Sequence, residues 1–174
     1  MRWIVLLRAV NVGGSGKLAM AELRESLAQG GAGNVATYIQ SGNIVMDHPL
    51  ETREEVADWT AALIERHFGF RPGAIALTPA DLAGALQAVP FAPEADPKTV
   101  LVHFCDRAPD PKAPEALATY CTNEEHLELV GTCLFLHAPN GIGRSKLNGR
   151  IEPALGCSAT ARNLNSLRKI QELA

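Results

Sequence analysis

Short apolar runs alternate with amphipathic stretches in the first half of the chain, and this pattern predicts strands and helices in a fixed order. Residues 2–10 form a nearly continuous apolar run, which is typical of a central strand buried on both faces. After it we predict a helix with Met20, Leu23 and Leu27 on one face, strands at 35–39 and 43–46, a helix from Thr52 to near Gly69, and a strand at 74–77. The order strand, helix, strand, strand, helix, strand is the pattern of a ferredoxin-like unit.

The second half of the chain repeats this order after a proline-rich connection. Thr78 and Pro79 predict a short helix, with Thr78 as its cap. The three prolines within residues 89–98 predict a linker. The elements predicted next are a strand at 99–104, a helix at 114–120, strands at 126–130 and 133–138 with a turn at Gly131 and Thr132, a helix at 145–155 that Pro153 bends or shortens, a strand at 158–160 and a closing helix at 162–173.

We therefore predict an α+β protein built from two tandem ferredoxin-like units with a connecting helix and a C-terminal helix. The predicted boundaries are a first domain at 1–78, a helix and linker at 79–98, and a second domain with the C-terminal helix at 99–174. The two halves share no obvious sequence identity. The tandem duplication is thus one of element order.

Composition and charge exclude few classes of protein. Of the 174 residues 47% are apolar and 20% are charged, which is ordinary for a globular protein. The net charge of −3 does not favour nucleic acid or acidic membranes. The apolar run near the first residue is too short to span a bilayer and lacks a cleavage site, so we expect a cytoplasmic protein with no membrane partner.

Neither the cysteines nor the histidines show the spacing of a metal site. Cys105, Cys121, Cys133 and Cys157 are irregularly spaced, without a Cys-x-x-Cys pair. We expect them to be small, buried residues in a reducing compartment, and we expect no cofactor.

The polar residues Gln40, Ser41, Gly42 and Asn43 interrupt an apolar stretch. They form either a hairpin turn between two strands or a bulge in one long strand. We expect strands 1 and 3 of a ferredoxin-like unit to be parallel, so the hairpin turn would lie at a different rim of the sheet from Asn11. A bulge would instead let the segment around Ser41 and the segment around Asn11 converge.

Residues 8–17, RAVNVGGSGK, join a strand to a helix through a glycine loop. Backbone N–H groups at such a loop can bind an anion, with charge added by Lys17. The spacing matches neither common phosphate-binding glycine motif, and the alternative is a connector that needs positive φ angles. Arg8 ends or interrupts a buried strand, so it lies at the strand's end or pairs with a carboxylate.

Two basic segments in the second half suggest the same chemistry. We take residues 139–147 as the counterpart of the first glycine loop. Arg144 and Lys146 lie there at a predicted helix start, and their positive charges oppose the helix dipole. The alternative there is a solvated turn. Thr160 is predicted to cap the last helix, which puts Arg162 and Asn163 in its first turn. Arg162 would then meet an anionic ligand or an internal carboxylate in a groove between the two units.

Five motifs together carry a family resemblance: LLRAVNVGG, MAELRESL, TYIQSGNIV, GRSKL and ATARNLNSLRKI. In this order they resemble a bacterial family of uncharacterised proteins, domain of unknown function number sixteen ninety-seven. The resemblance spans essentially the whole chain and implies a cytoplasmic bacterial α+β protein of two small domains, without an assigned reaction. One departure is that Leu164, Asn165 and Ser166 stand where the family has Trp and then Asn-Thr.

The leading functional hypothesis is a binding protein for a small anionic ligand, a nucleotide or another phosphate-bearing compound, in a groove between the two units. The candidate ligand-binding residues are Arg8, Asn11, Lys17, Gln40, Ser41, Asn43, Arg144, Ser145, Lys146, Arg162 and Asn163. One alternative is a transferase or hydrolase acting on a phosphorylated substrate, although no general base or Ser-His-Asp pattern is visible. Nucleic-acid binding is a further alternative, which the low aromatic content of 5% does not favour. The sequence does not indicate an oligomeric state.

Overall fold

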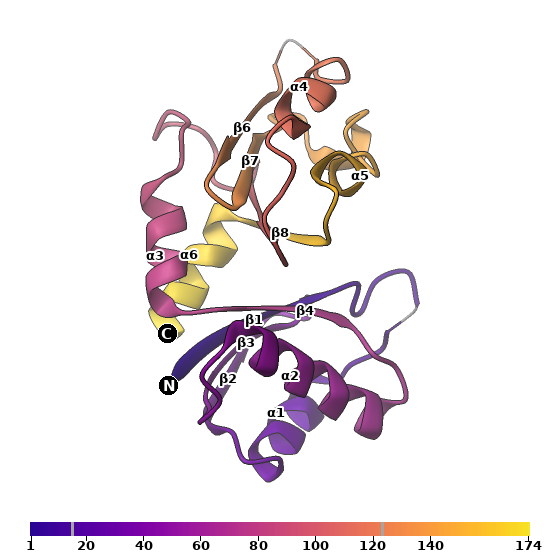
Figure 1. Cartoon of the computed structure of the whole chain (residues 1–174), viewed down its shortest axis with the longest axis vertical. Helices are drawn as coiled ribbons and strands as arrows, with labels where there is room; N and C mark the ends of the chain where they lie inside the picture. The colour runs from indigo at the N-terminus through magenta and orange to yellow at the C-terminus, as the bar shows by residue number, and fades with distance from the viewer. Residues whose placement is uncertain (15, 123) are drawn as a thin grey trace. The chain divides into compact units, whose positions relative to one another are not determined.

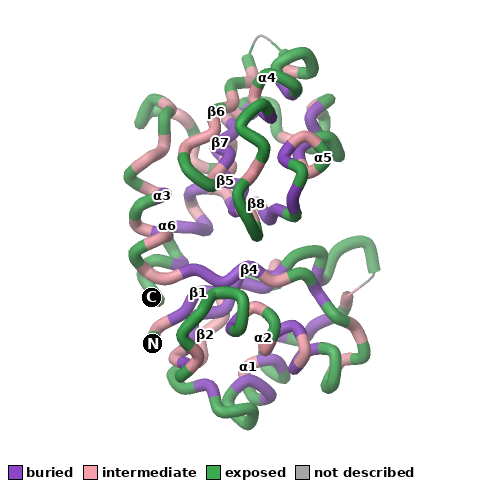
Figure 2. Tube along the Cα trace, in the orientation of Figure 1, coloured by how far each residue is buried: buried purple, intermediate pink, exposed green. Residues whose placement is uncertain are grey.

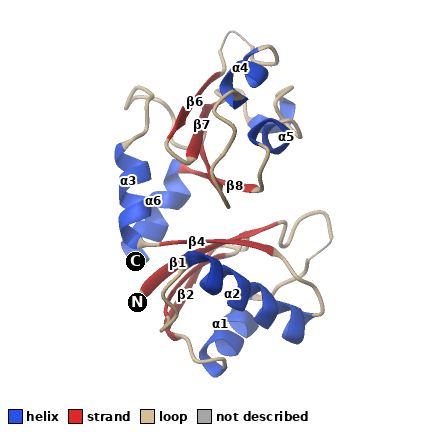
Figure 3. Ribbon diagram, in the orientation of Figure 1, coloured by secondary structure: helices blue, strands red, loops and turns tan. Residues whose placement is uncertain are grey.

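Two four-stranded antiparallel sheets, each accompanied by helices, form the framework of this mixed α+β protein (Figures 1 and 3). The computed structural model describes residues 1–14, 16–122 and 124–174. The contacts within the chain divide it into unit 1, residues 1–83 with 168–174, and unit 2, residues 84–167. The domain boundaries expected from the sequence stay a prediction.

Unit 1 has the element order predicted from its apolar pattern. Its elements are β1 (Arg2–Arg8), α1 (Met20–Gln29), β2 (Gly33–Tyr38), β3 (Asn43–Asp47), α2 (Arg53–Phe68), β4 (Gly73–Leu77), the first part of α3 (Pro79–Gln87) and the last part of α6 (Leu164–Leu173). The strand order is β2-β3-β1-β4, and every neighbouring pair is antiparallel. The central strand β1 is thus paired on both sides.

Burial of β1 on both faces explains its continuous apolar run. Trp3, Val5 and Leu7 pack into a core with residues of α1 and α2, whereas Ile4 and Leu6, on the other face, are also fully buried. Figure 2 shows the buried strands in purple and the exposed loops in green. Alternation is absent from the sequence here because neither face of the strand meets water.

The helix ends in unit 1 follow the predicted capping chemistry. Thr52 and Glu55 form a reciprocal capping box, and α2 ends at Gly69 with a φ of 77°. At the start of α3 the hydroxyl of Thr78 accepts a bond from the Asp81 N–H at 3.2 Å, and the Asp81 carboxylate accepts one from the Thr78 N–H at 2.8 Å. These caps confirm both predicted helix starts.

Unit 2 repeats the strand arrangement of unit 1. Its elements are the last part of α3, β5 (Val100–Cys105), α4 (Ala113–Ala118), β6 (His126–Val130), β7 (Cys133–His137), a short 3-10 helix η1 (Ile142–Arg144), α5 (Ile151–Leu155), β8 (Ala159–Asn163) and the first part of α6. The strand order is β6-β7-β5-β8, again antiparallel throughout. Gly131 and Thr132 form the predicted turn between β6 and β7, with a φ of 59° at Gly131.

Two predicted boundaries in the last third of the chain are wrong. The helix predicted over 145–155 is shortened, as Pro153 led us to expect, but it begins only at Ile151, and Pro153 lies in its first turn, where the missing N–H costs nothing. The strand predicted to stop at 160 continues to Asn163, because β8 pairs with β5 along its whole length. Consequently Arg162 lies on a strand, and the cap of α6 is Asn163, whose side-chain oxygen accepts the Ser166 N–H at 2.9 Å.

The segment Gln40 to Asn43 resolves as a hairpin turn, because Tyr38 and Asn43 are direct partners in the β2–β3 pair. The expected separation of this turn from Asn11 is wrong. It assumed that strands 1 and 3 are parallel, whereas β1 and β3 are antiparallel. The turn before β3 therefore lies at the same end of the sheet as the loop after β1, and the Leu7 N–H donates to the Gly42 carbonyl at 2.8 Å.

In the part of the chain that the structure describes, none of the helices has both the length and the apolar character needed to cross a bilayer.

Gly42 tests how tightly the turn packs on β1. A Cβ at Gly42 would lie 2.7 Å from Leu7 Cβ and 2.8 Å from Val10 Cγ2, and its φ is 78°. We expect Gly42→Ala to lower the free energy of unfolding by about 2–5 kcal/mol, through left-handed strain and overpacking together. Chemical denaturation measures the loss.

Gly14→Ala is the matched control, since Gly14 also has a positive φ of 81° but nothing lies within 4 Å of an added Cβ. Gly14→Ala should lower the free energy of unfolding only through the strain of the left-handed backbone, by about 1–2 kcal/mol. Equal losses in the two variants would show that the packing of the turn on β1 contributes nothing.

Candidate functional site

One end of the unit 1 sheet collects most of the polar residues that the sequence singled out in its first half. We call this region the loop rim: the described residues of the loop 9–18, which follows β1, and the turn 39–42. Asn11 joins the two segments. Its side-chain amide donates to the Leu18 carbonyl at 2.9 Å and to the Gln40 carbonyl at 2.8 Å, and its oxygen accepts the Leu18 N–H at 2.8 Å.

Asn11 and Asn43 consequently serve the fold. Asn11 adopts a φ of 54°, which asparagine tolerates better than most residues, and its own N–H donates to the Gly16 carbonyl at 2.9 Å. Asn43 is fully buried and donates to the Tyr38 carbonyl at 2.9 Å and to Ser41 Oγ at 3.1 Å. The side chains of these two residues hold the loop and the turn in place, so they are not the groups that a ligand would contact first.

Two cations lie at the ends of the glycine loop. Arg8 and Lys17 are exposed, as are Gly13 and Gly14 between them. The stem of Arg8 passes over Gly73 at the start of β4, where an added Cβ would lie 3.3 Å from Arg8 Cβ. Space is open beside Gly13 and Gly14, since nothing lies within 4 Å of a Cβ added at either position.

The candidate residues in unit 2 lie at a different place in their sheet. Arg144, Ser145 and Lys146 follow β7, the third strand of the unit, so their segment is not the topological counterpart of the glycine loop after β1. Arg144 ends a three-residue 3-10 helix and Lys146 lies before α5. The argument that their charges oppose the dipole of a regular helix is therefore wrong.

Ser145 has a structural role. Its Oγ accepts the Leu147 N–H at 3.1 Å, and it hydrogen-bonds the Glu125 side chain. The Glu125 carboxylate also accepts the Thr122 N–H at 2.9 Å. Although burial of Glu125 acts to raise its pKa, these hydrogen bonds outweigh burial and hold the pKa below its ordinary value.

Arg162 is buried in β8, with 8% of its surface exposed. Its Nη1 donates to Thr160 Oγ1 at 2.9 Å and to the Ala161 carbonyl at 2.8 Å. Burial lowers the pKa of its guanidinium to about 10, which still leaves it charged at neutral pH. The helix-dipole argument does not apply to Arg162, because it precedes α6.

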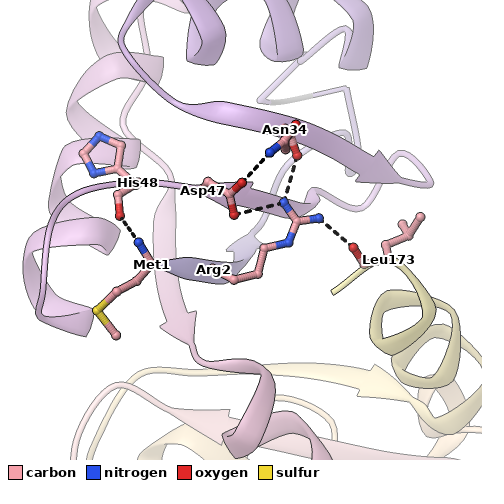
Figure 4. Close-up of polar contacts among 6 residues, drawn as sticks. All are labelled: Met1, Arg2, Asn34, Asp47, His48 and Leu173. Carbon is pink, nitrogen blue, oxygen red and sulfur yellow. Dashed lines mark hydrogen bonds and ion pairs between the residues drawn. The ribbon is translucent and has the colours of Figure 1, made fainter.

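A polar network at the opposite end of the unit 1 sheet was not anticipated from the sequence (Figure 4). Arg2 donates to the Asn34 carbonyl at 3.0 Å, to Asp47 at 3.4 Å and to the Leu173 carbonyl at 2.7 Å. Asn34 in turn donates to Asp47 at 2.6 Å, and this bond is the main cause that lowers the pKa of Asp47. The network ties the end of α6 to β1 and β3. The sequence signal for this network is the charged residue Arg2 directly before the buried apolar run of β1.

His103 is a buried titratable group. It lies on β5 with 7% of its surface exposed, and among the described residues its Nδ1 has no hydrogen-bond partner. Burial lowers its pKa to about 4, although a hydrogen bond with the backbone of Leu134 and the charge of Glu152 act in the opposite direction. His103 is thus neutral at physiological pH.

Unit 2 has a shallow depression of about 410 Å³ between α4 and β6, lined by Pro114, Glu115, Ala118, Cys121, Glu125, His126 and Leu127. Burial, followed by the charge of Glu125, raises the pKa of the Cys121 thiol, so it is a poor nucleophile at neutral pH. Within residues 1–14, 16–122 and 124–174, no three histidine, cysteine or carboxylate side chains are grouped closely enough to hold a metal ion.

The family model described as Protein of unknown function (DUF1697) matches residues 1–135, which confirms the family resemblance of the motifs. In structure the chain is similar to a conserved bacterial protein from Streptococcus pneumoniae, with a TM-score of 0.76 and 23% identity over 99% of this chain and 97% of that one. At this identity the likeness shows the fold alone. No curated protein matches the sequence.

The side chain of Asn11 should stabilise unit 1. We expect Asn11→Ala to lower the free energy of unfolding by about 2 kcal/mol, because three hydrogen bonds are lost and the left-handed backbone is less favourable for alanine. Hydrogen exchange should also accelerate at the Leu18 amide. Asn11→Gly separates the two causes, since glycine keeps the backbone conformation and lacks the bonds.

Asn148→Ala is a control at an exposed asparagine. If Asn11→Gly were as stable as the wild type while Asn11→Ala was not, the backbone conformation alone would account for the effect, and the side-chain bonds of Asn11 would have no net value.

His103 should make the stability of the protein depend on pH. Its pKa is about 4 in the folded chain against an ordinary 6.5, so between these values the unfolded chain binds a proton that the folded chain does not. The free energy of unfolding should therefore fall as the pH is lowered from 6.5 to 4, with a contribution of up to about 3 kcal/mol from this residue. Urea unfolding over this range measures it.

His103→Gln should remove that part of the pH dependence, whereas His126→Gln, at an exposed histidine, should retain it. Parallel pH profiles for the wild type and His103→Gln would contradict the assignment.

Proposed function

Since this chain belongs to the DUF1697 family of proteins of unknown function, we propose its function from its own geometry: it binds a small anionic, phosphate-bearing ligand at the loop rim. The observation that carries the proposal is the placement of Arg8 and Lys17. Both are exposed cations at the ends of a glycine loop that Asn11 holds against the 39–42 turn.

The loop has the properties of a preorganised anion site. Its glycines at positions 13, 14 and 16 all have positive φ angles, between 59° and 81°, and open space faces the first two. Backbone N–H groups in such loops can turn toward an anion, and the two cations add charge-assisted bonds. Because Asn11 already fixes the loop, less conformational entropy is lost when a ligand binds.

The surroundings favour an organic phosphate over a bare ion. Val12 and Ile39 are exposed apolar residues of the loop rim, with 65% and 49% of their surfaces accessible. They could contact an apolar part of a ligand whose phosphate meets Arg8 and Lys17, with Gln40 and Ser41 as neutral partners. A nucleotide has this combination of groups.

The proposed function at the loop rim is binding alone. Residues 8–18 and 38–43 contain no histidine, cysteine, aspartate or glutamate, so the loop rim offers none of the usual general bases. Binding without chemistry is therefore the simpler function for this site.

We also infer that each unit is ferredoxin-like and that the protein is cytoplasmic. The support for the fold is the element order combined with the antiparallel strand orders β2-β3-β1-β4 and β6-β7-β5-β8.

Ligand titrations test the proposal. Thermal-shift and NMR titrations would use inorganic phosphate, adenosine monophosphate and neutral adenosine at millimolar concentration. We expect the two phosphates to stabilise the protein, the nucleotide more strongly, with amide shifts concentrated in residues 8–18. Arg8→Gln and Lys17→Gln should each weaken binding by about tenfold, because each removes a charged contact.

Lys98→Gln is the matched control, since it removes the same charge from an exposed position in the linker. The proposal fails if no anion stabilises the protein, or if Lys98→Gln weakens binding as much as Lys17→Gln does.

A further inference from the structure

Three of the four cysteines lie at one end of the unit 2 sheet, although 52 positions separate the first from the last in the sequence (157 − 105). Cys105 ends β5, Cys133 begins β7, and Cys157 comes two positions before β8. The antiparallel pairing places these strand ends together: Phe104 is the direct partner of Cys133, and Cys105 is the direct partner of Ala159.

The backbone around Cys105 and Cys157 is held by further bonds beyond the last ladder pair. The Asp106 N–H donates to the Ser158 carbonyl at 3.0 Å, and Arg107 Nη2 donates to the Gly156 carbonyl at 2.9 Å. Cys105 and Ala159 share one face of the sheet, and Cys157, two residues before Ala159, continues on that face. Cys157 and Cys105 also belong to the same apolar core, beneath α4 and α5.

Cys105 and Cys157 are neighbours at this end of the sheet and in the core beneath it. Both Cys157 and Cys133 are close enough to Cys105 to affect its thiol electrostatically. Burial is the largest cause that raises the pKa of Cys105, followed by the neighbouring Cys157. The thiol form of Cys105 therefore dominates at neutral pH, and the thiolate that reacts with oxidants is scarce.

We propose that Cys105 and Cys157 form an oxidation-sensitive dithiol that closes to an intramolecular disulfide when the protein meets a hydroperoxide. All four cysteines are reduced in the structure, so the proposed disulfide is a second covalent state of the same chain. Because the pairing of β5 with β8 already brings the two cysteines to adjacent strand ends, closing the disulfide needs only a local approach of their sulfur atoms.

The chemistry balances with hydrogen peroxide as the oxidant. A thiolate of the pair attacks one peroxide oxygen, the O–O bond breaks, and a sulfenic acid and one water result after proton transfer. The second sulfur then attacks the sulfenic sulfur, the S–S bond forms, the S–O bond breaks, and a second water leaves. Two thiols are oxidised by two electrons, and one peroxide is reduced to two waters. Since the thiolate of Cys105 is scarce, we expect slow oxidation that accelerates as the pH is raised.

Cys121 is the natural comparison within the same unit. It lies beyond α4, beside Glu125 in the shallow depression, away from the strand ends that carry the other three cysteines. Oxidation of exposed thiols in general would modify Cys121 as readily as Cys105, because both are partly exposed. A disulfide that joins Cys105 to Cys157 requires their juxtaposition.

Peptide mapping of the oxidised protein tests the proposal. The full chain is treated with hydrogen peroxide, remaining thiols are blocked, and the protein is digested without reductant. We expect the intact mass to fall by two hydrogens, the reactive thiols to fall from four to two, and one linked pair of peptides to contain Cys105 and Cys157. The oxidised protein should unfold at a higher denaturant concentration, since a cross-link restricts the unfolded chain, and dithiothreitol should reverse this shift.

Variants separate this pair from its neighbours. Cys121→Ser and Cys133→Ser should still form the Cys105–Cys157 link, whereas Cys105→Ser and Cys157→Ser should lose both the link and the shift in stability. The wild-type peptide map remains decisive if one of the latter variants fails to fold. The proposal is overturned if the wild type links mainly to Cys121 or Cys133, forms only intermolecular disulfides, or is oxidised to sulfinic acid without a link.

Discussion

The antiparallel pairing of one central strand on both sides is the constraint on which each unit depends. In unit 1 that strand is β1, and in unit 2 it is β5. When the first strand pairs antiparallel with the third and the fourth, its C-terminal end must lie beside the beginnings of both. The loop after the first strand, the hairpin turn before the third and the start of the fourth consequently meet at one rim.

The same rim carries different chemistry in the two units. In unit 1 it holds a glycine loop, two exposed cations and the bridging Asn11. In unit 2 it holds the thiols of Cys105, Cys133 and Cys157. One arrangement of strands thus gathers residues from three separate segments in each unit, and the side chains gathered there differ between the two units.

Polar side chains within this framework divide into those that hold the fold and those that face solvent. Asn11, Asn43 and Ser145 resemble ligand contacts when only the sequence is read, yet their hydrogen bonds hold a loop, a hairpin turn and a second loop in place. Satisfying backbone groups in irregular segments requires such residues, because an unpaired buried polar group is costly. Arg8 and Lys17 are exposed residues at the two ends of the glycine loop.

The order of strands and helices could be predicted from the sequence, because apolar periodicity and capping chemistry act over a few residues. The continuous run of β1, the capping box at Thr52 and Glu55, and the turn at Gly131 are all local signals, and all are confirmed. The predicted end of β8 was wrong, because pairing with β5 extends the strand through Arg162 and Asn163. Such pairing joins residues that are far apart in the sequence, so no local signal reports it. The family assignment was likewise available from short motifs.

Proximity between distant segments was decided by the tertiary structure alone. Nothing in the sequence around Asn11 specifies that its amide meets the Gln40 carbonyl, and nothing in the spacing of Cys105 and Cys157 brings their strand ends together. Both meetings follow from the direction in which strands pair, which is set by packing across the whole sheet. A local pattern defines which segments are strands, whereas the burial of their faces together determines which ends become neighbours.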